Sequence, residues 1–153
     1  MRNARTGSLA AANSGTAAIE FALVAPVFLM FVFGGIEFAR LLWTQEALQQ
    51  TAIAGARCMA IAQGAIQNSA CTSGGTYNAA TTKSQLESIA RGWGLSLQDS
   101  NITLDNTTAC GGSTGVFSQV KINTTFTTPV PQIVLLSAGD PLTATACYPN
   151  NPF

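Results

Sequence analysis

The sequence predicts an α+β protein in which a long N-terminal transmembrane helix continues into a stalk and carries a small head. Residues 16–62 form one helical stretch in which Pro26 is the only proline, and residues 21–36 within it carry no charge. Three segments in the last third of the chain alternate apolar and polar side chains, as β-strands do. We therefore expect the head, residues 63–153, to contain a second helix packed on an antiparallel sheet of about three strands.

The uncharged run follows a small, polar and basic leader, residues 1–15. As a helix its sixteen residues span about 24 Å, slightly less than the roughly 30 Å hydrocarbon core of a bilayer. Flanking residues complete the span, with Arg40 placed to snorkel and Trp43 to lie at the membrane interface. Pro26 is expected to kink this helix.

The charges around the run predict its orientation. Arg2 and Arg5 precede it with no acid among them, so the positive-inside rule keeps the N-terminus in the cytoplasm and places the head outside. A conventional cleaved signal peptide is disfavoured because the run continues into bulky and charged residues at 36–43. The span therefore has its N-terminus inside and its C-terminus outside.

The predicted stalk carries small residues on one face: Ala47, Thr51, Ala54 and Cys58. Such a stripe permits close packing against another helix. Alanine also favours helices whatever they pack against. The sequence leaves both interpretations open.

Four cysteines suit an oxidising compartment, where an even number usually forms disulfide bonds. Three pairings are possible. We favour Cys58–Cys71, which closes a short local loop, and Cys110–Cys147, which ties two strand-like segments together. A structural zinc site is the rival interpretation, but the chain has no CxxC pair and no histidine.

The head begins with a predicted loop at residues 63–81, followed by a helix at residues 82–94. Thr82 and Gln85 have capping-box spacing, and Gly94 ends the helical pattern. The apolar face of this helix comprises Leu86, Ile89, Ala90 and Trp93. We expect this face to lie across the sheet.

The predicted strands are residues 101–105, 116–127 and 141–147, with a turn at residues 110–115. The apolar face of the longest strand comprises Val116, Val120, Ile122 and Phe126. Residues 129–140 contain two prolines, which favours an exposed connecting loop. Its apolar residues, 133–136, either join the core or form a patch for a partner.

The composition argues against an enzyme or a nucleic-acid-binding protein. A formal net charge of zero gives no basic surface for nucleic acid. The absence of histidine removes the commonest general base and the Ser-His-Asp arrangement. The acidic residues form no obvious pair, and no phosphate-binding loop is present. We therefore expect no catalytic site, no cofactor, no metal and no nucleic-acid partner.

The order of a small-residue leader, Gly15, four residues and Glu20 resembles the processing region of type IV prepilins. Residues 15–57 as a whole are similar to the TadE-like family of the tight-adherence pilus system. The ordered run that carries this resemblance is Glu20-Phe21, Pro26, Glu37-Phe38, Arg40-Leu41, Ala47-Leu48-Gln49 and Gly55-Ala56-Arg57. Departures are minor: Thr16 begins the expected mature chain, and Gly34 adds a small residue beside the usual glycine.

The resemblance implies a minor pilin or pseudopilin-like component of pilus assembly. A prepilin peptidase would cut between Gly15 and Thr16 and leave a mildly acidic mature chain anchored in the bacterial inner membrane, with a periplasmic head at the base, tip or body of a pilus. Its partners would be other pilins and the inner-membrane assembly platform. The implied assembly residues are Glu20, Phe21, Pro26, Glu37 and Arg40.

Alternatives remain for the charged residues and for the function. Glu20 either pairs with the Thr16 ammonium of a neighbouring subunit or marks the cytoplasmic membrane boundary. Glu37 and Arg40 either form a local i, i+3 pair, stand as separate interfacial charges or contact a partner helix. The alternative function is an uncleaved, membrane-anchored extracytoplasmic binding module unrelated to pili. An extracytoplasmic enzyme is the third hypothesis.

Overall fold

The structure is a computed structural model, and it describes residues 10–64, 69–112, 115–128 and 141–150. Its elements, in order, are α1 (Ala10–Gln63), β1 (Thr72–Ser73), β2 (Thr76–Tyr77), α2 (Ala79–Gly92), the 3-10 helix η1 (Asp99–Asn101), β3 (Ile102–Thr108), β4 (Phe117–Thr125) and β5 (Pro141–Pro149). The α+β class, with a long apolar N-terminal helix and a second helix, is confirmed. The connection at residues 129–140, including the apolar residues 133–136, lies outside the described residues.

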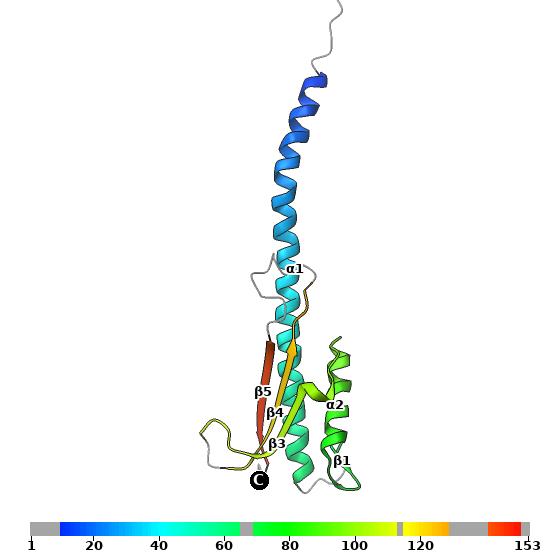
Figure 1. Cartoon of the computed structure of the whole chain (residues 1–153), viewed down its shortest axis with the longest axis vertical. Helices are drawn as coiled ribbons and strands as arrows, with labels where there is room; N and C mark the ends of the chain where they lie inside the picture. Colours follow the sequence, from blue (N-terminus) through cyan, green and yellow to red (C-terminus); the bar gives the residue numbers. More distant parts are fainter. Residues whose placement is uncertain (1–9, 65–68, 113–114, 129–140, 151–153) are drawn as a thin grey trace, which may run out of the picture.

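Helix α1 is 54 residues long, about 80 Å, and starts six residues before the predicted Thr16. Figure 1 shows its N-terminal half projecting away from the head and its C-terminal half running through the head. The helix continues through Pro26. The residues after Trp43 do not form a separate stalk, because Leu48, Ala52, Ala56 and Met59 are buried in the core. The predicted stalk is therefore the spine of the head.

Strands β3, β4 and β5 form an antiparallel sheet in that order, and one face of the sheet packs on α1. The buried apolar side chains of this face are Ile102, Val120, Ile122, Ala144 and Ala146. A side-chain bond joins the layers where Nε2 of Gln49 donates to the carbonyl oxygen of Thr145 at 3.2 Å. The predicted strands are thus present, although each observed strand has different bounds.

The apolar face predicted for β4 is wrong at its first position. Val116 precedes the strand and is 56% exposed, whereas Ser118 is fully buried. Nε2 of Gln63 donates to Ser118 Oγ at 3.0 Å, and Ser118 in turn donates to Oδ1 of Asn150. The buried hydroxyl is therefore satisfied by one side chain from α1 and one from the residue that follows β5.

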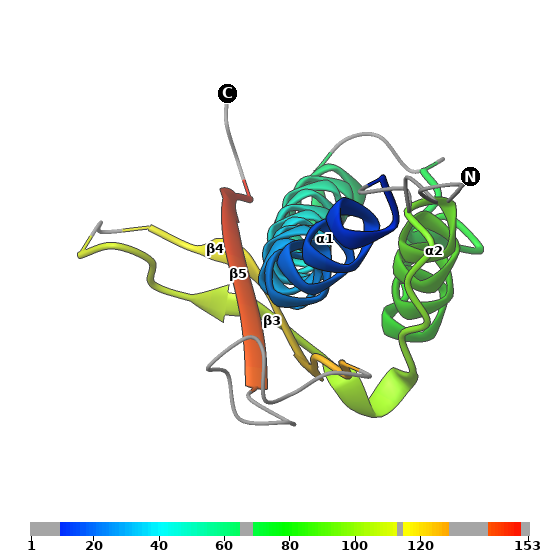
Figure 2. The ribbon, with the colours of Figure 1, turned by 90° about the horizontal axis from the view of Figure 1, so that it is seen from above.

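Helix α2 packs mainly against α1, on the side opposite the three-stranded sheet, as Figure 2 shows. The expectation that it lies across the sheet is wrong, because α1 occupies that face. Leu86 and Ala90 are buried as predicted, and Thr82 joins them. Close approach of the helices depends on Gly55, since a Cβ there would lie 2.5 Å from Cδ2 of Leu86.

The start of α2 also differs from the prediction. Its N-cap is Asn78, whose Oδ1 accepts a hydrogen bond from the Thr81 backbone N–H at 3.0 Å, so the expected Thr82–Gln85 capping box is absent. Thr82 instead donates its hydroxyl to the Asn78 carbonyl at 2.8 Å. The predicted end at Gly94 is confirmed: Gly94 has φ of +80°, and Leu95 N–H donates to Ala90 O.

Part of the predicted loop at residues 63–81 is an antiparallel hairpin of β1 and β2. Gly74 and Gly75 make its turn with φ values of +61° and +82°, which glycine adopts without strain. The Cys58–Cys71 disulfide fastens the start of this hairpin to α1, with a Cα–Cα distance of 5.9 Å.

Within the predicted small-residue stripe, Ala47 and Thr51 are buried.

Candidate functional site

The N-terminal half of α1 exposes nearly all of its apolar side chains. Between Ile19 and Ile36 the large apolar side chains are 38–77% exposed, with Phe21 at 73% and Phe31 at 77%. Soluble monomeric proteins rarely expose a contiguous apolar surface of this extent, and such a surface indicates contact with a membrane or with a partner protein. By length and composition, α1 is a candidate membrane-spanning helix. We call residues 19–36 the apolar segment; Pro26 lies within it and is exposed.

The predicted processing position lies just before the apolar segment. Because α1 begins at Ala10, the Gly15–Thr16 bond is inside the helix. A side chain at Gly15 would meet no atom within 4 Å, so the surroundings of this bond are open. Glu20 is exposed and follows Thr16 by four residues, which places both on one face of the helix.

A charged junction joins α1 to the head where the apolar segment ends. Nη1 of Arg40 lies 2.8 and 3.0 Å from the two carboxylate oxygens of Glu37. The Glu37 side chain is buried, while 52% of the Arg40 side chain is exposed. The local i, i+3 pair expected from the sequence is therefore present.

The same junction reaches residues that follow β4. Thr128 forms a side-chain hydrogen bond with the Glu37 carboxylate. The Arg40 guanidinium carbon lies 5.9 Å from the ring centroid of the buried Phe126, within cation–π range. Glu37 and Arg40 thus fasten the helix to its own head, and their interactions account for the burial of Glu37.

Replacing Arg40 by Met is expected to destabilise the head, because the buried Glu37 carboxylate loses its cation. The Glu37→Gln, Arg40→Met double variant should regain part of the lost stability, since a neutral amide needs no counter-charge. Urea unfolding of the full chain in detergent micelles, followed by tryptophan fluorescence, measures both. Equal midpoints for wild type and Arg40→Met would contradict the role assigned to the pair.

The indole of Trp43, three residues after Arg40 on α1, contacts the indole of Trp93. Trp43 and Trp93 pack edge to face, with ring centroids 5.6 Å apart and planes at 64°. Nε1 of Trp43 donates to the Trp93 carbonyl oxygen at 3.4 Å. Both side chains remain partly exposed, at 57% and 38%. The pair joins α1 to the C-terminal end of α2.

The predicted assembly residues do not form one site. Glu20 and Glu37 are separated by seventeen residues of helix, about 25 Å. The sequence analysis expected Arg40 and Trp43 at the membrane boundary but missed the contacts that Thr128, Phe126 and Trp93 make with this part of α1. Strand alternation predicted that Phe126 is buried, but no local signal could show that it lies beneath Arg40.

One cleft in the described part of the chain is lined by few groups suited to catalysis. This cleft of about 280 Å³ between α1, residues 94–97 and the end of β4 has Arg40 as its one charged lining residue. No group of three or more potential metal ligands occurs among the described residues. Burial raises the pKa of the Tyr77 phenol, opposed by a hydrogen bond with Thr82, so the phenol is protonated at neutral pH.

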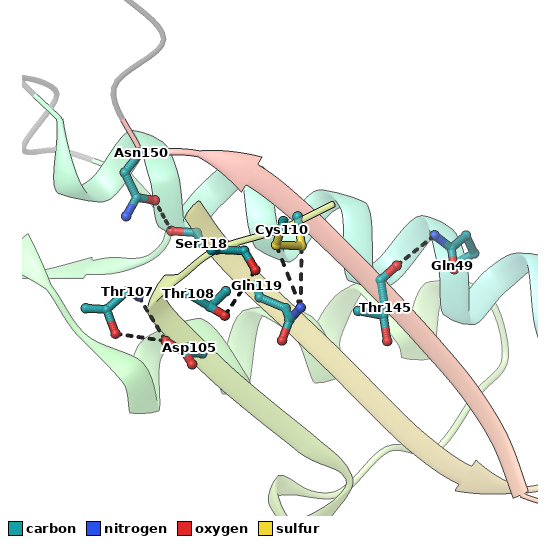
Figure 3. The surroundings of a disulfide bond; sticks show 11 residues. Gln49, Asp105, Thr107, Thr108, Cys110, Ser118, Gln119, Thr145 and Asn150 are labelled. Atoms are coloured by element: carbon teal, nitrogen blue, oxygen red, sulfur yellow. Dashed lines mark hydrogen bonds between the residues drawn. A yellow bond between two sulfur atoms is a disulfide. The ribbon is translucent and has the colours of Figure 1, made fainter. Parts of the chain in front are cut away.

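The structure contains both disulfide bonds favoured from the sequence. Cys110, after β3, is bonded to Cys147 of β5 across a Cα–Cα distance of 6.4 Å. Figure 3 shows this bond above Gln119 of β4, whose Nε2 lies 3.7 and 3.5 Å from the two sulfur atoms. Because Gln119 pairs with Cys147 in the sheet, the bond ties the end of β3 to the far strand across β4.

Among the described residues, one helix could span a membrane, and the second half of that helix forms the spine of a small α+β head. This arrangement defines the class of protein. The family model described as TadE-like protein matches residues 15–57. Over these residues the chain is therefore similar to the TadE-like family. No curated protein and no solved structure matches the chain.

Proposed function

We propose that the protein is a minor pilin or pseudopilin-like component of tight-adherence pilus assembly. A prepilin peptidase cleaves it after Gly15, α1 anchors it in the bacterial inner membrane, and the head lies in the periplasm. The apolar segment then packs with other pilins and with the inner-membrane assembly platform. The observation that carries the proposal is this exposed segment within the TadE-like match, with Gly15 before it and Glu20 near its start at the family's spacing.

The helical state of the Gly15–Thr16 bond is compatible with cleavage. The bond lies within two turns of the N-terminus of α1, where helices open most readily. Glycine is about 1 kcal/mol less favourable than alanine within a helix, so Gly15 weakens the helix where a peptidase must open it. In this proposal the protein is the substrate of the peptidase and not itself an enzyme, and its head serves in assembly.

Co-expression with a prepilin peptidase is expected to remove residues 1–15, and Gly15→Leu is expected to block that loss. A bulky side chain would stabilise the helix and obstruct the peptidase at the bond. Intact mass of membrane-extracted protein measures the outcome. Gly35→Ala, at another open position of α1, is the matched control and should be cleaved normally. Retention of the full leader in the wild type would favour an uncleaved binding module.

The Glu20→Gln variant is expected to be cleaved and inserted normally, but its affinity for other pilins should fall by about tenfold or more. A charge unmatched in hydrocarbon costs about 2.5–3.5 kcal/mol, and each 1.4 kcal/mol is tenfold in affinity. In the proposed assembly, the Thr16 ammonium of one subunit loses the acid of its neighbour. Co-purification with sheared pili measures this.

The control for Glu20 is Glu46→Gln, which changes an exposed acid on the head portion of the same helix. It should leave co-purification unchanged. Equal co-purification of Glu20→Gln and wild type would mean that Glu20 only marks the membrane boundary.

A further inference from the structure

We propose that the paired indoles of Trp43 and Trp93 lie in the phospholipid headgroup layer, so that the head is docked on the membrane surface through α2 as well as through α1. The proposal rests on the membrane anchoring by α1 proposed above. It goes beyond that anchoring because Trp93 belongs to the head. The ligand is the headgroup layer of the same bilayer that α1 crosses.

The depth of Trp43 follows from the length of the helix. Counted from Glu20, the charge directly before the uncharged run 21–36, Trp43 lies 23 residues further along α1, about 35 Å away. The hydrocarbon core is about 30 Å thick, and each headgroup layer adds about 5–7 Å. Trp43 therefore lies beyond the hydrocarbon and within the headgroup layer.

The exposed apolar surface of α1 ends at the same level. Beyond the apolar segment, Phe38 is 54% exposed, Leu42 50% and Trp43 57%. The next exposed large apolar residue on the helix, within the described part of the chain, is Ile53. The indoles thus lie at the end of the apolar surface nearest the head, and tryptophans are enriched at such boundaries between membrane and water.

Helix α2 is oriented so that its C-terminus reaches this level. Trp93 caps α2, and the left-handed conformation of Gly94 then turns the chain back toward η1. Figure 1 shows this end of α2 nearer to the projecting half of α1 than β1 is. Trp93 is consequently at the end of α2 that faces the membrane.

The polar groups at this level also fit a headgroup layer. An indole combines an apolar ring with one N–H, and the N–H of Trp43 is bonded to the Trp93 carbonyl oxygen. Arg40 lies about one turn deeper than Trp43, is half exposed and contacts Glu37 through Nη1. It is 20 residues, about 30 Å, from Glu20, so its guanidinium lies where the hydrocarbon meets the headgroup layer.

The chain has two tryptophans, and both belong to this pair, so intrinsic fluorescence reports on this site alone. The test uses the full chain reconstituted in vesicles of phosphatidylcholine and phosphatidylglycerol in equal amounts. Single-tryptophan variants Trp43→Phe and Trp93→Phe separate the two signals while keeping an aromatic ring at each position. Lipids brominated near the headgroup or near the chain end quench at two depths, and aqueous iodide quenches from solvent.

In Trp43→Phe we expect Trp93 emission to shift to the blue on reconstitution and to be quenched more by shallow than by deep bromines. Strong iodide quenching without bromine quenching would overturn the proposal. Protection from iodide without bromine quenching would also overturn it and would point to a second copy covering the indoles. Resistance of the chain to alkaline extraction from the same vesicles tests anchoring separately, so failure of the anchor is distinguishable from failure of the docking.

Discussion

Replacing both Cys110 and Cys147 by Ser is expected to lower the free energy of unfolding of the head by about 4 kcal/mol. The bond joins residues 37 apart in sequence, so its loss frees a long loop in the unfolded chain. In the folded head it is also the covalent tie between the end of β3 and β5. Urea unfolding of the full chain in micelles, followed by the fluorescence of Trp43 and Trp93, measures the change.

The matched control is the Cys58→Ser, Cys71→Ser double variant. This bond spans 13 residues, so its loss should cost about 3 kcal/mol, less than the loss of the longer link. The order of the two effects is the informative result. A greater loss for the Cys58–Cys71 variant would show that local anchoring of the β1–β2 hairpin outweighs loop length.

Local periodicity predicted the elements of this fold well, because helix and strand patterns depend on neighbouring residues. The uncharged run predicted a continuous helix, and alternation in β4 placed Val120, Ile122 and Phe126 correctly on the buried face. Prediction was poorer where a stronger local competitor was present. Asn78 caps α2 in place of Thr82, since asparagine is the better N-cap and Thr82 is buried against the core.

The sequence could not show which element covers which face. The second half of α1 carries small residues on several faces, so it can pack with the sheet and with α2 at once. A stalk and a core helix have the same periodicity, and the choice between them depends on contacts with residues far along the chain. The candidate site shows the same limit: spacing predicted the roles of Gly15 and Glu20, whereas the contacts of Thr128 with Glu37 and of Trp93 with Trp43 depend on the tertiary fold.

Leu86→Ala is expected to destabilise the head by about 3 kcal/mol, within the 2–5 kcal/mol typical of buried leucines. Leu86 is 1% exposed and fills the space above Gly55, where α2 meets α1. Its loss leaves a cavity between the two helices. Because Trp43 and Trp93 connect the same helices, their fluorescence follows the transition, and the urea midpoint measures the loss.

Gly55→Ala tests the same contact from the other helix. Its effect on the stability of the head should be opposite in the wild type and in the Leu86→Ala background. In the wild type the new Cβ would lie 2.5 Å from Leu86 Cδ2, so overpacking should outweigh the gain in helix propensity and destabilise the head by about 1 kcal/mol. In the Leu86→Ala background the methyl group enters the cavity, so the same substitution should stabilise the head by about 1 kcal/mol. Gly92→Ala, at an open position of α2, should be neutral or slightly stabilising in both backgrounds. Equal effects of Gly55→Ala in both backgrounds would mean that Gly55 and Leu86 do not share this space, and that α2 is held against α1 by other contacts.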